Sequence, residues 1–370
     1  MRNRKENVIA RHPRRLSALR PGGKGSRIAK LSCLFLLAAV LSIMPGCGSK
    51  ASSGGEDGEA PAPIVPAPPE ETFFFPYTGE ETGDPFKVKN VPLSVKIENS
   101  AAARPQMGLN RTDVVYETMV EGGETRFNCI FQSQIPEEVG PVRSARLSDL
   151  WIVPQYQGLF FYSGGNTDVV QKIRASDIAD MSHSVASAIF RRVDFRSAPH
   201  NLYLRLDKGY ETAQLKGFGT RSDSLAPLNH GSVDAAPTAS AGAITLNFGG
   251  SDIRWDWDAE RGVYLRSQSG KALTDAVDDQ QVFTVNVAVL YADYAQQAML
   301  DPAGSPTYDT TLGGTGKAIL FRDGRQYECA WKADRHTPPS LTNAAGETIP
   351  LKPGRTWFEV LPPRGSIRTE

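Results

Sequence analysis

The hydrophobic pattern of residues 87–232 alternates between strand-like and helix-like segments. Apolar residues occupy every second position in 91–99, and β-branched and aromatic residues dominate 112–120, 125–133 and 158–165, which predicts short strands. Segments 143–156, 166–173 and 210–219 have the apolar spacing and end signals of helices. We therefore predict a mixed α/β sheet domain in this part of the chain.

The pattern changes after a bridge of small residues at 230–243. From there to residue 362 nearly all apolar runs are short, strand-like and separated by Gly- or Pro-containing turns. Asp323 and Gly324, between two such runs, are a strong signal for a two-residue hairpin. The chain is thus predicted to be α+β, with a mixed α/β domain at 87–232 and a mostly-β, sandwich or barrel-like domain at 243–365.

The N-terminal segment has the pattern of an export signal. Residues 1–30 carry ten Lys or Arg and one acid, Glu6, and an apolar run follows at 31–43. That run is shorter than the roughly 20 residues that a membrane-spanning helix needs. Gly46 and Cys47 come just after it, so we predict a lipoprotein signal at 1–46 and lipidation at Cys47. An uncut membrane anchor is the alternative.

The segment that follows is predicted to be a disordered tether. Residues 47–86 are rich in Pro, Ala, Gly and Glu and low in apolar residues. We expect the body to be held at the outer face of the cytoplasmic membrane through its lipid anchor. Beyond residue 46 the chain has 31 basic and 40 acidic residues, a formal net charge of −9. It therefore lacks the excess of basic residues that is typical of nucleic-acid-binding proteins.

The chain lacks the usual catalytic and metal-binding signatures. It contains no G-x-S-x-G, no S-x-x-K with K-T-G and no H-E-x-x-H pattern, and its histidines are scattered. Residues 313–318 resemble part of a phosphate loop but have Ala318 where a Ser or Thr belongs, so a turn is predicted. Cys129 and Cys329 could pair in an exported protein or serve as apolar residues. We predict no metal and no cofactor.

Polar strings rich in arginine are the most distinctive feature of the first domain. They span 98–109, 116–127, 140–146 and 191–203, and each places an Arg beside a small residue at the end of a predicted element. Arg suits the recognition of phosphate or carboxylate, and helix N-termini add backbone donors. The candidate ligand-binding residues are Arg104, Glu121, Arg126, Arg143, Arg146, Arg196 and His200.

The same arginines could have a purely structural role. Glu98, Glu117, Glu121 and Glu124 lie in the same strings and could close internal ion pairs. Arg143 and Arg146 are three residues apart and are predicted to share a face in the first helical turn. The helix dipole disfavours a cation there, which indicates a nearby acid or a ligand.

Five motifs resemble the YerB-type lipoprotein family of Gram-positive envelope proteins. They are ARPQMGL, VVYETMVEGGETRF, GPVRSAR, FRSAPHNLY and the C-terminal pair GKAILF and TWFEVLP. The resemblance implies an envelope location, an N-terminal and a C-terminal module, and no accepted enzymatic activity. Where the family is expected to read close to HSGGS, this chain has Tyr162 and Asn166 around SGG.

These observations leave three hypotheses for function. The leading one is a non-catalytic envelope lipoprotein that binds an anionic ligand or a wall-associated partner, such as a cell-wall enzyme, a wall polymer or its precursor. The second is an enzyme that acts on phosphorylated wall precursors through an arginine-lined pocket. The third, a solute-binding lipoprotein, ranks last because the body lacks two equal α/β lobes.

Overall fold

The computed structural model describes residues 71–250, 252–301 and 304–370, and strands dominate these residues. The predicted signal segment, Cys47 and residues 47–70 of the tether lie outside them. Three short α-helices occur, α1 (Asp149–Tyr156), α2 (Thr167–Arg174) and α3 (Gly209–Leu215). The body is therefore mostly β, with few helices.

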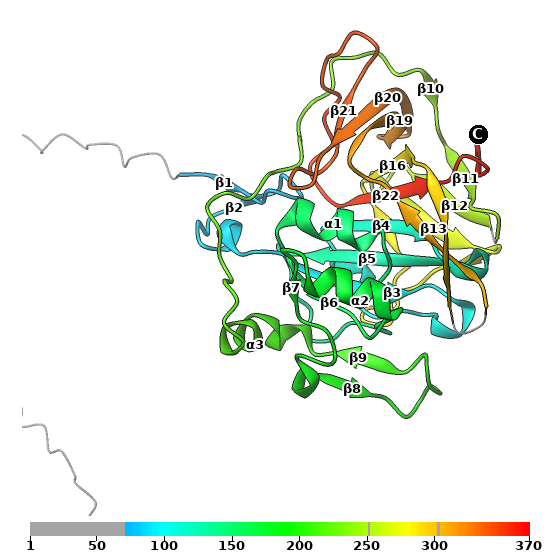
Figure 1. The fold of residues 1–370 in the computed structure, drawn as a ribbon. Coiled ribbons are helices and arrows are strands. Elements are labelled where there is room, and N and C mark those ends of the chain that lie inside the picture. Colours follow the sequence, from blue (N-terminus) through cyan, green and yellow to red (C-terminus); the bar gives the residue numbers. More distant parts are fainter. Residues whose placement is uncertain (1–70, 251, 302–303) are drawn as a thin grey trace, which may run out of the picture. The chain divides into compact units, whose positions relative to one another are not determined.

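An eleven-stranded sheet contains strands from both predicted domains (Figure 1). Its order is β10-β20-β19-β16-β22-β4-β5-β3-β6-β7, and β21 pairs with β20. The first predicted domain supplies β3 (Leu93–Glu98), β4 (Val114–Met119), β5 (Thr125–Phe131), β6 (Leu159–Phe161) and β7 (Ala179–Asp180). The second supplies β16 (Asn286–Tyr291), β19 (Gly314–Arg322), β20 (Arg325–Ala333), β21 (Ser340–Thr342) and β22 (Thr356–Leu361), and β10 (Ala239–Ser240) comes from the bridge of small residues between the two.

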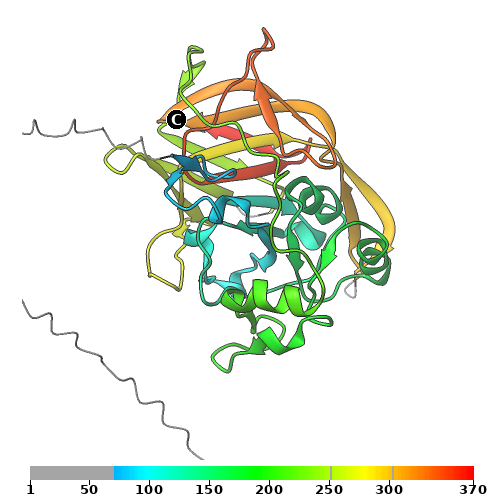
Figure 2. The same ribbon diagram turned by 90° about the vertical axis from the view of Figure 1, so that its left-hand side faces the viewer.

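Strand β22 joins the two halves of this sheet. It pairs in parallel with β16 on one side and with β4 on the other. Figure 2 shows the C-terminal strands, in orange and red, continuing the layer of the cyan N-terminal strands. The described residues fall within one compact unit. The domain boundaries 87–232 and 243–365 stay predictions. Strands from both segments form one continuous sheet.

A second sheet packs against one face of the first. Its order is β14-β13-β12-β11-β23, with β15 pairing β13. A shared core contains apolar side chains of both sheets, among them Val95, Phe127, Trp255 and Trp357. The strands are β11 (Ala243–Asn247), β12 (Asp252–Asp258), β13 (Val263–Gln268), β14 (Lys271–Ala272), β15 (Phe283–Thr284) and β23 (Ser366–Thr369).

Helices α1 and α2 cover part of the other face, across the strands β3 to β6 (Figure 1). Three two-stranded ribbons complete the structure. They are β1 (Phe73–Phe74) with β2 (Glu81–Thr82), β8 (Phe190–Arg192) with β9 (Leu202–Leu204), and β17 (Tyr294–Leu300) with β18 (Pro306–Thr310).

Local signals explain two of the predicted elements. The side chain of Asn166 accepts a hydrogen bond from the backbone N–H of Asp168 at 3.1 Å and so caps α2. Asp323 and Gly324 have φ of 55° and 67°, as the tight turn between β19 and β20 requires. Both predictions are confirmed.

Three expectations need correction. Residues 71–86 were predicted to be tether, but they contain β1, β2 and the fully buried Tyr77, because this stretch is aromatic enough to join the core. The helix expected from residue 143 begins only at Asp149. Residues 314–318 form the start of β19 and not a turn.

Candidate functional site

A row of polar side chains lies on the face of the central sheet opposite the second sheet. Lys96 and Glu98 of β3 stand directly beside Asn128 and Arg126 of β5. Leu93, Val95 and Ile97 point to the opposite face. Strand alternation predicts such a polar row, but here α1 and the segment 142–148 cover it, so its members must pair with one another.

Lys96 and Asn128 of this row both bind Asp149 at the start of α1. Lys96 Nζ lies 2.8 Å from Asp149 Oδ1, and both side chains are fully buried. Asp149 also accepts hydrogen bonds from the side chain of Asn128 and from the backbone N–H of Arg146. Burial lowers the pKa of Lys96, and the interaction with Asp149 opposes that shift. These contacts hold the start of α1 against the sheet.

The segment 142–146 is held extended, and Leu147 and Ser148 form a turn before α1, which explains why the helix starts late. The backbone N–H groups of Val142, Arg143 and Ala145 donate to the carbonyls of Leu202, Lys96 and Gly164. Arg143 and Arg146 therefore do not share a helical face, and that expectation was wrong. Extended backbone directs them to different partners.

Arg146 makes internal contacts through its Nε and one terminal nitrogen. Its Nε donates to Glu121 Oε2 at 2.7 Å and its guanidinium also binds the carbonyl of Ala145 at 2.8 Å. Glu121 in turn accepts a hydrogen bond from Thr307 Oγ1 of β18 at 3.1 Å. Glu121 therefore links the β17–β18 ribbon, through Thr307, to Arg146 in the first half of the chain.

Three side chains contact the carboxylate of Glu98 at the end of β3. His200 Nδ1 lies 2.8 Å from Glu98 Oε1, and Ser100 Oγ donates to the same oxygen at 2.7 Å. Arg143 Nε lies 3.4 Å from Glu98 Oε2. The terminal nitrogens of Arg143 form no hydrogen bond with any described residue, and its side chain is 23% exposed.

Arg126 has no carboxylate partner among the described residues. Its one hydrogen bond runs from a terminal nitrogen to the carbonyl of Ser144 at 3.0 Å. Burial and the charges of Arg146 and Arg143 lower the pKa of Arg126 to about 9. Its side chain is partly buried, and its Nε and second terminal nitrogen form no hydrogen bond with the described residues.

Arg104 and Arg196 serve the neighbouring loop. Arg104 donates to the carbonyl of Asn99 at 2.7 Å, and Arg196 donates to the carbonyls of Ala102 and Pro105 at 2.8 and 2.6 Å. Burial lowers the pKa of Arg104. Arg104 thus closes the 99–105 loop on itself, and Arg196 holds this loop against the body.

Five of the seven candidate residues thus gather around Glu98. We call the following set the Glu98 cluster: Glu98, Glu121, Arg126, Arg143, Arg146 and His200. Within it, Arg143 and Arg146 have carboxylate partners, as the structural alternative expected, whereas Arg126 does not.

A second buried cluster, which was not predicted from the sequence, lies between the two sheets. Arg266 of β13 contacts Glu117 of β4 at 2.7 Å and Glu359 of β22 at 3.1 Å, and all three side chains are fully buried. Burial and the neighbouring charge of Glu117 raise the pKa of Glu359. Arg266 lies in a strand with an ordinary alternating pattern, so its burial depends on the packing of two distant segments. We call this set the Arg266 cluster.

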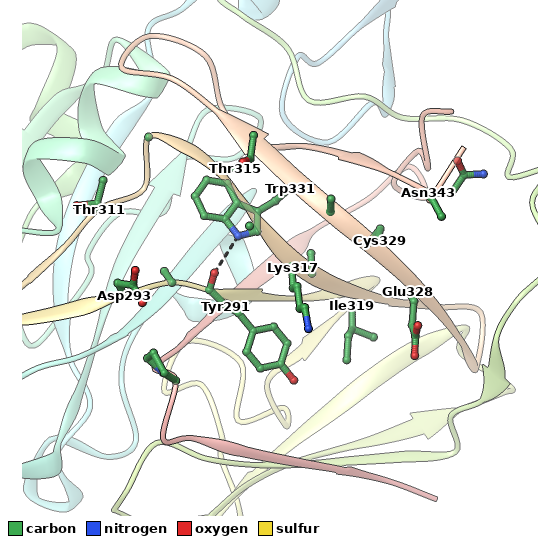
Figure 3. A pocket seen from close by; sticks show the side chains of 17 residues that line it. Tyr291, Asp293, Thr311, Thr315, Lys317, Ile319, Glu328, Cys329, Trp331 and Asn343 are labelled. Atoms are coloured by element: carbon green, nitrogen blue, oxygen red, sulfur yellow. Dashed lines mark hydrogen bonds between the residues drawn. The ribbon is translucent and has the colours of Figure 1, made fainter. Parts of the chain in front are cut away.

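A cavity of about 1060 Å³ lies on β16, β19 and β20 (Figure 3). Tyr291, Lys317, Ile319 and Glu328 extend to the same side of the strands there. Lys317 and Glu328 form no ion pair or side-chain hydrogen bond with the described residues. The cavity includes the start of β19, which the sequence had suggested only as a turn.

The two cysteines of the body are both free thiols. Cys129 is fully buried in the core shared by the two sheets, where it acts as an apolar residue. Cys329 lies on β20, and burial raises its pKa to about 12. The disulfide that the sequence left open is not formed.

Membrane-spanning helices and metal-binding clusters are both absent from the described ranges 71–250, 252–301 and 304–370. None of the helices there has the length and apolar character needed to cross a membrane. No group of three or more His, Cys, Asp and Glu side chains there could hold a metal ion.

Comparison with known proteins places these features in a family. Residues 77–219 match the N-terminal domain, and residues 244–358 the C-terminal domain, of a family described as a protein of unknown function, DUF3048. The chain is 30% identical over 293 residues to the Bacillus subtilis strain 168 protein named "Putative lipoprotein YerB", covering 78% of this chain and 86% of that protein.

The fold agrees with a solved structure. A crystal structure of YerB from Bacillus subtilis matches with a TM-score of 0.71 and 28% identity, over 80% of this chain and 100% of that one. The two modules of the motif resemblance correspond to the two matched domains. The chain belongs to the DUF3048 family, together with YerB.

Proposed function

We propose that this protein is a lipid-anchored, extracytoplasmic and non-catalytic protein that binds an anionic, wall-associated ligand at Arg126 and Arg143. The observation that carries the proposal is the missing counter-charge at Arg126. The Glu98 cluster holds three arginines and two glutamates, and each glutamate contacts a different arginine. One positive charge is left without a partner.

An anion at this place would relieve an electrostatic cost. The partly desolvated Arg126 is repelled by Arg143 and Arg146, as the direction of its pKa shift indicates. Charge-assisted hydrogen bonds from guanidinium groups to phosphate or carboxylate oxygens are about twice as strong as neutral ones. Arg126 and Arg143 both have nitrogen atoms left to donate, whereas Arg146 already donates to the carboxylate of Glu121.

The proposed location depends on the N-terminal segment, which lies outside the described residues. The Gly46-Cys47 sequence after an apolar run supports processing and lipidation, and the name of the Bacillus relative describes it as a lipoprotein. A diacylglyceryl group supplies two acyl chains, which suffice for stable anchoring. The body would then reach its ligand in the wall space, where a wall enzyme, polymer or precursor is the proposed partner.

Replacement of Cys47 tests the anchor. We expect Cys47→Ala to abolish lipid attachment, because no thiol remains to be acylated. Metabolic labelling with a radioactive fatty acid measures this directly, with Cys33→Ala as the matched control that keeps its label. A labelled Cys47→Ala chain would contradict the proposal, as would an unlabelled wild-type chain, the outcome that an uncut peptide anchor predicts.

Replacement of Arg126 tests the binding site. We expect Arg126→Gln to weaken binding of inorganic phosphate or sulfate by about 10- to 100-fold, because a hydrogen bond to a charged group contributes about 1.5–3 kcal/mol. Calorimetric titration of the purified full-length chain in neutral detergent measures the affinity.

The control for this experiment is Arg368→Gln, which removes an exposed arginine on β23. It should bind the anion as the wild type does. Equal weakening in both variants would indicate a general charge effect and would contradict a site at Arg126.

An enzyme acting on phosphorylated wall precursors is the second candidate. The pairing of His200 with the buried Glu98 favours it, because a carboxylate that orients a histidine is a common arrangement in general acid–base catalysis. Release of phosphate from a bound ester by the wild type, lost in His200→Phe, would support this candidate over the non-catalytic one.

A further inference from the structure

We infer that the ligand of the Glu98 cluster is a phosphodiester that carries a hydroxyl group close to its phosphorus. This inference rests on the proposed anion binding and specifies its chemistry. It draws on the charge of the cluster, the number and origin of its unused donors, and the hydrogen-bonding state of His200.

The charge of the cluster matches a singly charged anion. With His200 left out of the count, three guanidinium and two carboxylate groups leave one positive charge. A phosphodiester carries one negative charge, whereas a phosphate monoester carries about 1.5 to 2 at neutral pH. A monoester would therefore leave excess negative charge beside the buried Glu98 and Glu121.

The unused donors come from two separate elements. Arg126 extends from β5 and keeps its Nε and one terminal nitrogen, and Arg143 extends from the 142–148 segment and keeps both terminal nitrogens. The two non-bridging oxygens of a phosphodiester can each face one guanidinium. A single planar carboxylate is satisfied by one guanidinium fork, so it would leave the other unused.

His200 supplies an acceptor beside these donors. Glu98 Oε1 is 2.8 Å from Nδ1, and an ionised carboxylate can only accept, so Nδ1 carries the hydrogen. In the tautomer with a hydrogen on Nδ1 alone, the other ring nitrogen, Nε2, is an acceptor. It has no partner among the described residues, and the side chain is 27% exposed.

An acceptor next to an anion site calls for a donor on the ligand. The non-bridging and ester oxygens of a phosphodiester only accept hydrogen bonds, so they cannot satisfy Nε2. A hydroxyl group on the alcohol of the ester can donate to it. The ligand that matches all the unused groups is therefore a phosphodiester of a polyol.

The loops beside the cluster leave room for such a ligand. Gly122 follows Glu121, and Gly164 accepts the backbone hydrogen bond of Ala145. A Cβ atom built on either glycine would meet no heavy atom within 4 Å. Both positions therefore border open space.

A comparison of three small probes tests the inference. The full-length chain in neutral detergent is titrated with glycerophosphoglycerol, dimethyl phosphate and glycerol 3-phosphate. We expect glycerophosphoglycerol to bind about tenfold more tightly than dimethyl phosphate, the effect of one added hydrogen bond. Glycerol 3-phosphate should also bind more weakly, because of its extra charge.

Variants of His200 assign the preference to its ring. His200→Phe should bind glycerophosphoglycerol and dimethyl phosphate equally, and His200→Gln, which restores an acceptor, should recover part of the preference. Equal binding of both diesters by the wild type, or tighter binding of glycerol 3-phosphate, would overturn the inference while leaving anion binding intact. Failure of all three probes to bind would overturn both proposals.

Lipid headgroups and soluble polymers can both present this group. Bound glycerophosphoglycerol is therefore challenged with phosphatidylglycerol vesicles and, separately, with a soluble polyglycerol phosphate. Displacement by either supports the inference and identifies the source. Displacement by neither contradicts it.

Discussion

Replacement of Arg266 by methionine is expected to lower the free energy of unfolding by about 3–5 kcal/mol, because it leaves two glutamates buried without their cation. Arg266 lies between Glu117 and Glu359, and the three side chains are fully buried. The rings of Phe127, Trp255 and Trp357 surround its guanidinium at 4.8 to 5.6 Å. Urea unfolding followed by tryptophan fluorescence measures the change.

Two further variants separate the charge effect from simple loss of packing. Glu359→Gln should cost much less, because burial and Glu117 already favour the protonated form of Glu359. A triple variant, Arg266→Met with Glu117→Gln and Glu359→Gln, should recover part of the stability. A triple variant that is no more stable than Arg266→Met would show that the unpaired buried charges are not the cause of the lost stability.

Replacement of Lys96 by methionine is expected to cost a similar amount, about 3–5 kcal/mol. Lys96 and Asp149 form a fully buried pair, and methionine matches the length of the lysine stem without its charge. Asp149 would keep its hydrogen bonds from Asn128 and Arg146 but lose its only cation within 4.0 Å among the described residues. Urea unfolding monitored by circular dichroism measures the loss.

The double variant Lys96→Met with Asp149→Asn is the control. It removes the uncompensated charge and should be more stable than Lys96→Met alone. A loss of stability in the double variant that is smaller than the sum of the two single losses is the signature of a direct pair. Additive effects of the two replacements would contradict the role assigned to the pair.

Elements specified by neighbouring residues were predictable from the sequence. The cap at Asn166, the turn at Asp323 and Gly324, and the strands β3, β4 and β5 follow from residues a few positions apart. In each case a local side chain or backbone preference decides the structure, and no distant segment is needed.

Features decided by distant contacts were missed. Hydrogen bonds from residues 142, 143 and 145 to three other segments override the helical pattern at 143–148. The burial of Arg266 requires β13, β4 and β22 to meet. Alternation in β3 correctly separates apolar from polar positions but cannot show that α1 covers the polar side.

The candidate site was found in part. The arginine-rich strings identified most of the Glu98 cluster, because Arg next to Gly and Pro at element ends is unusual. They could not single out Arg126, because tertiary structure sets both the glutamate that pairs with Arg146 and the backbone carbonyls that bind the other arginines.

The position of β22 has a consequence for the order of folding. Residues 356–361 pair with both β16 and β4, so a chain synthesised only as far as residue 355 exposes two unpaired strand edges. Exposed edges of this kind invite pairing with other chains. The large sheet is therefore complete only when the last part of the chain has been made, and a truncation before residue 356 leaves both edges open.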